Sequence, residues 1–234
     1  MPSVSPFHPY ATRLPNESPE YVEARDRLQR AEIELMRQRE GVAEKRRALP
    51  PGPAVTDYIF LEGPDHLDQG DLPVRPVQLS ALFTEPGRPL LAYQFMYGKK
   101  QVDPCPMCTM WLDGFNGVVG HVQRQVDFVV IAAADPEQLR EHARRRRWDR
   151  LRLLSCGANS FKYDLGSEDE AGNQDSTISV FTRDGDGTVR HQYSTRPRMD
   201  ADLDQRGIDL LSPVWSLLDL TPQGRGDWYP GLDY

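Results

Sequence analysis

The sequence predicts an α/β protein, a three-layer α/β/α sandwich preceded by a long N-terminal helix. Two apolar runs of strand length, residues 90–97 and 126–134, are each followed by a helical pattern. This order favours a parallel βαβ unit with right-handed crossovers. An Asp-Gly-Asp-Gly turn at 184–187 separates two further short apolar runs and indicates a β-hairpin. Before position 50, apolar residues spaced by three and four indicate the long helix.

The N-terminal helix is expected between Ser18, a good N-cap followed by Pro19, and the Pro50-Pro51-Gly52-Pro53 stretch that must end it. Its apolar stripe is expected to pack on the domain that follows, with a homodimer through this helix as the alternative. Six residues make up the stripe: Tyr21, Ala24, Leu28, Ala31, Leu35 and Val42.

The overall composition excludes several classes of protein. The 234 residues carry a formal net charge of -7, which gives no general attraction to nucleic acid or to an anionic membrane surface. No apolar stretch has the length of a membrane span, and the N-terminus has neither the basic nor the apolar region of a secretory signal. We therefore expect a cytoplasmic protein. Three cysteines are too few, and odd in number, for a disulfide framework.

The chain is expected to have three segments: a tail and amphipathic helical arm at 1–54, a folded domain at 55–222 and a loose C-terminal tail at 223–234. From residue 90 the expected order of elements is strand, CxxC motif, helix, strand, helix, irregular segment, hairpin and helix. This is the order of the thioredoxin fold. Beside the two long strands, the expected elements are a strand at 58–61, helices at 111–122, 136–147 and 208–218, and hairpin strands at 178–182 and 189–194.

The CxxC motif, Cys105-Pro106-Met107-Cys108, falls where a buried strand ends and a helix should begin. Unsatisfied backbone N–H groups and the positive end of the helix dipole favour a thiolate at such a position. Cys108 lies about one helical turn further on, where its sulfur can attack a mixed disulfide formed at Cys105. We therefore expect Cys105 to be the nucleophile and Cys108 the resolving cysteine of a dithiol-disulfide oxidoreductase that needs no cofactor.

Two other interpretations of the cysteine pair stay open. A zinc site needs about four ligands, and the chain has no second CxxC motif. Copper is the alternative cofactor, because two thiolates with His121, or with His191, form a soft ligand set for Cu(I). In that case the chain is a metal-binding protein, or a metal-dependent oxidase or oxygenase of a small molecule, on the same fold.

Several longer blocks of sequence resemble one family. The segments YQFMYG, CPMCTMWLDGFNG, FVVIAAADPEQLR, SCGANSFKYDLG and SVFTRDGDGTVRHQYSTRPRMD are similar to the bacterial thioredoxin-like family called domain of unknown function eight-nine-nine, commonly described as predicted dithiol-disulfide oxidoreductases. The resemblance implies a thioredoxin-like fold with Cys105 and Cys108 at the active-site position. It implies a thiol or disulfide substrate, on a protein or a small molecule.

Three neighbouring features qualify the site. Lys99 and Lys100 are expected to be solvated, although they could lower the pKa of Cys105 by folding over it. Cys156 is expected to be an ordinary semi-buried thiol. Thioredoxins place a cis-proline before the hairpin, where this chain has Ser176-Thr177-Ile178.

Overall fold

The structure is a computed structural model that describes residues 15–157, 159–200, 207–208 and 211–233. The chain divides into two compact units, Met1–Leu49 and Pro50–Tyr234. Every strand and both cysteines of the CxxC motif belong to the second unit, so the candidate chemistry lies in that unit alone.

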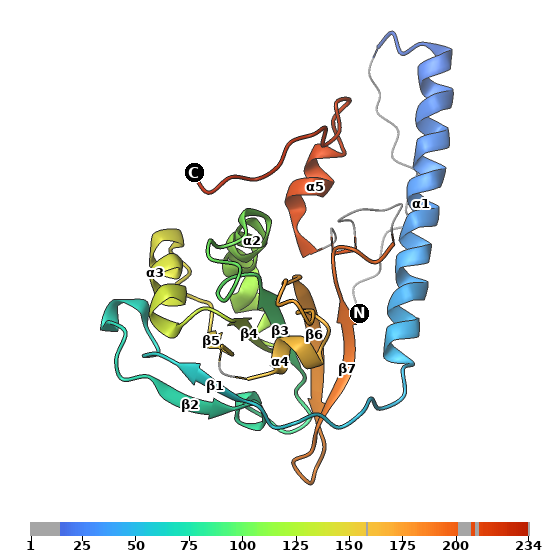
Figure 1. Ribbon diagram of the computed structural model, residues 1–234. Helices are drawn as coiled ribbons and strands as arrows, with labels where there is room; N and C mark the ends of the chain where they lie inside the picture. Colours follow the sequence, from blue (N-terminus) through green and yellow to red (C-terminus); the bar gives the residue numbers. More distant parts are fainter. Residues whose placement is uncertain (1–14, 158, 201–206, 209–210, 234) are drawn as a thin grey trace. The chain divides into compact units, whose positions relative to one another are not determined.

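The first unit contains the long helix α1, Pro19–Arg47 (Figure 1). Ser18 caps it as expected, because the Ser18 hydroxyl accepts a hydrogen bond from the Tyr21 amide at 3.2 Å. Glu23 and Arg27 form the expected ion pair one turn apart, at 2.6 Å. No residue of α1 is buried. The helix is therefore confirmed, while the surface that its apolar stripe contacts stays a prediction.

The second unit is built on one seven-stranded sheet with the order β2-β1-β5-β4-β3-β6-β7. Strands β3, β4 and β5 are parallel, whereas β6 and β7 form an antiparallel hairpin on one side and β1 and β2 another on the other side. The strands are β1 Ile59–Glu62, β2 Arg75–Gln78, β3 Leu90–Phe95, β4 Asp127–Ala132, β5 Leu153–Ser155, β6 Thr177–Arg183 and β7 Val189–Thr195.

Two helices make the crossovers between the parallel strands. Helix α2 connects β3 to β4, and helix α3 connects β4 to β5. This βαβ unit followed by a hairpin and a helix, with β3 between β4 and β6, is the expected thioredoxin-like arrangement. The helices are α2 Pro106–Val122, α3 Pro136–Arg146, α4 Phe161–Asp164 and α5 Pro213–Leu218, with short 3₁₀ helices at Leu67–Gln69 and Leu79–Leu82.

The core lies on both faces of the sheet because the central strands alternate their side chains. On β3, Tyr93 and Phe95 face α2 and α3, whereas Leu90 and Ala92 face α4 and the second 3₁₀ helix. All six residues of β4 are buried, as its unbroken apolar sequence predicted. The layer of α2 and α3 carries the CxxC motif, while the opposite layer has only short helices.

The irregular regions contain elements that the sequence pattern did not predict. Strands β2 and β5 and helix α4 are four, three and four residues long, too short to show a period. The last helix was expected from residue 208, but α5 begins at Pro213, and residues 209–210 lie outside the described part of the chain.

Two arginines in the last turn of α3 form ion pairs with carboxylates elsewhere in the chain. Arg144 contacts Asp71 at 2.7 Å and Arg146 contacts Asp113 at 2.6 Å. Both carboxylates therefore hold the C-terminal turn of α3 in place.

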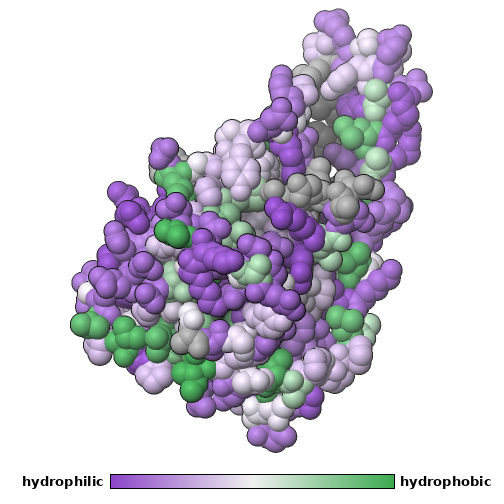
Figure 2. Space-filling view, in the orientation of Figure 1, coloured by the Kyte–Doolittle hydropathy of each residue, from purple (hydrophilic) through white to green (hydrophobic). Residues whose placement is uncertain are grey.

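The surface of the second unit is mostly polar, with apolar patches at the lower left of Figure 2. There the β1–β2 hairpin exposes Ile59, Leu61, Leu72 and Val74. Among the described residues, no helix is both long and apolar enough to cross a membrane.

Candidate functional site

The two cysteines lie where β3 ends and α2 begins. Cys105 is the N-cap of α2, with Pro106 in the first helical position. The Cys105 amide donates to the carbonyl of Met96 at 3.1 Å, which fixes the cap against the end of β3. All three cysteines are free thiols, so the structure shows the dithiol form.

The helix start gives the Cys105 sulfur a hydrogen-bond donor from the main chain. The Cys108 amide N–H donates to Cys105 Sγ at 3.5 Å, which is the contact expected of an N-cap side chain. Cys105 is 8% exposed and Cys108 only 1%. Of the two sulfur-bearing residues, Cys105 is thus the more exposed.

The environment separates the pKa values of the two thiols. The pKa of Cys105 is lowered to about 7, chiefly because the Cys108 thiol donates a hydrogen bond to its sulfur. Burial acts in the opposite direction and raises the pKa, while the amides of Cys108 and Met107 lower it further. Burial raises the pKa of Cys108 well above its ordinary value, and the neighbouring Cys105 raises it further. Near pH 7 Cys105 is therefore about half thiolate, whereas Cys108 keeps its proton.

Tyr93 lies beneath the pair on β3. Its side chain is fully buried, and its hydroxyl has no hydrogen-bond partner of normal geometry in the described part of the chain. Burial, and next the negative charge of Cys108, raise the pKa of Tyr93 well above its ordinary value. Tyr93 thus stays a neutral phenol, and its hydroxyl group stabilises a thiolate at Cys108, lowering the pKa of that thiol.

The C-terminal segment also reaches the site, which the sequence did not predict. The Tyr229 hydroxyl interacts with Cys105 and helps to lower the pKa of that thiol. Burial, and next the charges of the two cysteines, raise the pKa of Tyr229 to about 12, so it remains a hydrogen-bond donor. A pair of aromatic residues, Trp228-Tyr229, in an otherwise polar tail was the only sequence signal for this contact.

Contacts on both sides of Tyr229 hold this segment in place. The Trp228 ring packs edge-on against Trp215 of α5, with ring centroids 5.4 Å apart. Beyond Tyr229, the carbonyl of Leu232 accepts a hydrogen bond from Arg146 of α3 at 3.3 Å. Residues expected to form a loose tail are therefore attached to the domain, and Figure 1 shows them running from α5 past α2.

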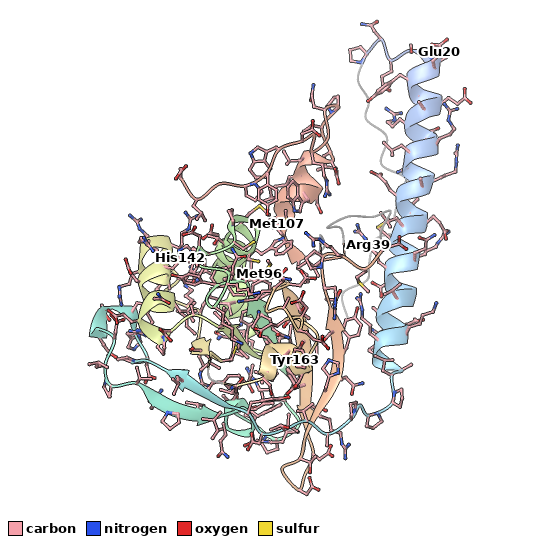
Figure 3. The ribbon with its side chains drawn as sticks, in the orientation of Figure 1. Glu20, Arg39, Met96, Met107, His142 and Tyr163 are labelled. Carbon is pink, nitrogen blue, oxygen red and sulfur yellow. The ribbon has the colours of Figure 1, made fainter. Side chains whose placement is uncertain are left out.

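A small cavity of about 70 Å³ opens beside the two sulfurs. Met96 and Met107, labelled in Figure 3, line it from the end of β3 and the first turn of α2. Ser176, in the stretch where thioredoxins have a proline, lines it as well. The remaining lining residues are Trp111, Gln174, Asp175, Pro197, Arg198 and Tyr229.

The other candidate residues lie away from the dithiol or have other partners. Lys99 pairs with Glu168 at 2.8 Å, and Lys100 donates to the carbonyl of Ala171. Cys156 is 2% exposed, and burial raises its pKa to about 11. Neither lysine is among the main causes of the lowered pKa of Cys105, and Cys156 is a buried thiol with a raised pKa.

Among the histidines that the structure describes, none is brought to the two thiols. His121 is exposed at the far end of α2, thirteen residues beyond Cys108, which is about 20 Å along a helix. His191 lies on β7, where its Nε2 contacts Ser194 Oγ at 2.7 Å. In the described part of the chain, no group of three or more His, Cys, Asp or Glu side chains could hold a metal ion. The proposed ligand set of Cys105, Cys108 and His121 is therefore not assembled.

Comparison with solved structures gives distant similarities. The chain resembles peroxidoxin BcpB from Mycobacterium tuberculosis at 18% identity, covering 60% of this chain and 82% of that one, with a TM-score of 0.42. A cysteine-to-serine mutant of Xanthomonas campestris peroxiredoxin Q is 13% identical, with 64% of this chain and 85% of that one covered and a TM-score of 0.46. Mycobacterium bovis AhpC is 15% identical, with 77% of this chain and 98% of that one covered and a TM-score of 0.46.

The family comparison covers almost the whole chain. No curated protein matches it significantly. The family described as "Bacterial protein of unknown function (DUF899)" matches residues 11–233. The match confirms the resemblance carried by the CPMC block and the hairpin block, and the chain belongs to this bacterial family.

Proposed function

We propose that this protein is a dithiol-disulfide oxidoreductase in which Cys105 attacks and Cys108 resolves. The observation that supports this most directly is the position of Cys105 at the N-cap of α2, with the Cys108 amide 3.5 Å from its sulfur. A thiolate is the attacking species in thiol-disulfide exchange, and a thiol with a pKa near the ambient pH is the best attacking group. The pKa of about 7 at Cys105 meets this condition.

The reaction has two steps. In the first, the Cys105 thiolate attacks one sulfur of a disulfide, a Cys105–substrate bond forms, and one thiolate leaves. In the second, Cys108 loses its proton and attacks Cys105 Sγ, the Cys105–Cys108 bond forms, and the second substrate thiolate leaves. The Tyr93 hydroxyl stabilises the developing charge on Cys108, because it lowers the pKa of that thiol. A dithiol reductant restores the starting state.

Trapping of the intermediate tests the proposal. Reduced Cys108→Ser protein is expected to form a stable one-to-one mixed disulfide at Cys105 with a small disulfide, whereas the Cys105→Ser variant forms none. The wild-type protein should instead end as a Cys105–Cys108 disulfide, two mass units lighter than the dithiol. Cys156→Ser is the matched control, because this buried thiol is not expected to react. Mass spectrometry of peptides locates the bond in each case.

Two outcomes contradict the proposal. A mixed disulfide that forms equally at all three cysteines would show that Cys105 has no special reactivity. Stoichiometric copper in protein purified without a chelator, lost in Cys105→Ser, would favour the metal-binding alternative.

A further inference from the structure

Two residues that line the cavity beside Cys105 each carry a buried polar atom that has no hydrogen-bond partner in the described part of the chain. One is the indole nitrogen of Trp111, a donor, and the other is Oε1 of Gln174, an acceptor. The amide nitrogen of Gln174 donates to the carbonyl of Gly98 at 2.7 Å, which leaves its oxygen as the free atom. Most buried polar groups in proteins have a partner, so a donor and an acceptor left together beside a reactive sulfur point to a ligand.

The size of the cavity limits that ligand. One water needs about 10–15 Å³ of such volume, so a space of about 70 Å³ holds a group of about five to seven non-hydrogen atoms. The cavity, with a volume of about 70 Å³, is lined by Cys105 and Tyr229, among other residues. A protein disulfide has two backbones within about 6 Å of each other, which is far more material than this space admits.

We propose that this cavity is the substrate subsite of the dithiol, and that it takes one thiol half of a small disulfide that carries a hydroxyl group. A hydroxyl is both acceptor and donor, so one such group on the substrate satisfies Trp111 Nε1 and Gln174 Oε1 together. The inference rests on the proposed function and adds the class of substrate to it.

The chemistry follows the two steps given above. Cys105 Sγ bonds to the sulfur of the half that occupies the cavity, and the other half leaves as a thiolate. Cys108 then displaces the bound half, so two small thiols are released for each Cys105–Cys108 disulfide formed. Tyr229 lines the cavity and its hydroxyl interacts with Cys105, so we expect its side chain to move aside before a protein substrate reaches that sulfur.

Three oxidants of the reduced protein test the subsite: bis(2-hydroxyethyl) disulfide, dipropyl disulfide and insulin. The first two differ chiefly in the terminal hydroxyl of each half. Each rate is divided by the rate of the same oxidant with dithiothreitol, which removes intrinsic reactivity. Wild-type protein is expected to prefer the hydroxyl-bearing disulfide over the propyl compound about tenfold, the usual order for one buried hydrogen bond, and to react least with insulin.

Variants separate the hydrogen bonds from general packing. Trp111→Phe and Gln174→Leu should each reduce the hydroxyl preference toward one. Thr177→Val is the matched control, because Thr177 Oγ1 is also buried without a partner in the described residues but Thr177 does not line the cavity. Tyr229→Ala should raise the relative rate with insulin by fivefold or more.

Each remaining outcome has a definite meaning. An unchanged hydroxyl preference in both Trp111→Phe and Gln174→Leu, or a wild-type rate with insulin equal to that with the small disulfides, overturns the subsite proposal alone. If no disulfide oxidises the reduced protein faster than expected for an ordinary buried thiol, the proposed function itself fails.

Discussion

Cys105 and Cys156 are both nearly buried thiols, 8% and 2% exposed, yet their pKa values move in opposite directions. The pKa is about 7 for Cys105 and about 11 for Cys156. Burial opposes the thiolate in both places. At Cys105 the Cys108 thiol and the amides of Cys108 and Met107 outweigh burial, whereas at Cys156 the charges of Lys162 and Lys99 and its own amide do not. The donors at the start of α2, and not the degree of exposure, therefore separate the two pKa values.

The largest expected effect is the difference in alkylation between these two cysteines. At pH 7 about half of Cys105 is thiolate, whereas only about one part in ten thousand of Cys156 is, so iodoacetamide should modify Cys105 at least a thousandfold faster in the native state. Mass spectrometry of quenched samples measures both rates. Comparable rates would mean that the two environments do not differ as described.

His142 is a third buried titratable group, and here burial has the largest effect on the pKa. Burial, helped by Arg145 and Arg146, lowers its pKa from 6.5 to about 4, while Asp113 opposes the change. Between these values the unfolded chain binds a proton that the folded chain does not, so stability falls as pH drops from 6.5 to 4. We expect a loss of about 2 kcal/mol, less than the full shift implies because solvent screens part of the charge.

Urea denaturation at pH 7 and pH 4.5 measures this loss. In His142→Gln, which carries no titrating ring, this part of the pH dependence should disappear. The matched control is His121→Gln, because His121 is exposed on α2. If both variants lose stability equally with falling pH, the effect does not come from the buried imidazole.

Cys108→Ala should reduce the difference in pKa between Cys105 and Cys156. The Cys108 thiol is the largest cause of the lowered pKa at Cys105, so its removal should raise that pKa and slow alkylation of Cys105 at pH 7 about tenfold. The pH profile of the alkylation rate measures the change. Cys156→Ala serves as the control. An unaltered pH profile in Cys108→Ala would show that main-chain amides alone lower the pKa of Cys105.

The smallest expected effect is that of Tyr229→Phe. The Tyr229 hydroxyl contributes less than the donors of Cys108 and Met107, so alkylation of Cys105 at pH 7 should slow only about two- to threefold. Tyr163→Phe is a suitable control, because Tyr163 is an exposed tyrosine on α4. A faster reaction in Tyr229→Phe would show that this ring acts only as a steric cover.

The sequence allowed the central fold to be predicted because its signals were local and long. The run at 126–134 became β4 with all six of its residues buried, and the Asp-Gly-Asp-Gly turn joined β6 to β7. The three-residue strand β5 was missed because its place beside β4 depends on pairing, which a sequence pattern does not record. Sequence patterns therefore predicted β1, β3, β4, β6 and β7, but not the short strands β2 and β5.

The candidate site was predictable only in part, for the same reason. Cys105 and Cys108 lie on consecutive turns of one helix start, so their proximity follows from chain spacing. Tyr229 lies more than a hundred residues further on, and its contact with Cys105 depends on how the last segment crosses the domain. No spacing rule links the two positions, although the Trp228-Tyr229 pair in a polar tail was a hint.

The main chain of Met96 touches both halves of the dithiol. Its carbonyl accepts from the Cys105 amide, and its own amide lowers the pKa of Cys108. The side chain is dispensable for these two contacts, so many residue types could occupy this position. Because the contact of the Met96 amide with sulfur changes when Cys108 gains or loses a bond, its nitrogen chemical shift would serve as a built-in reporter of the oxidation state.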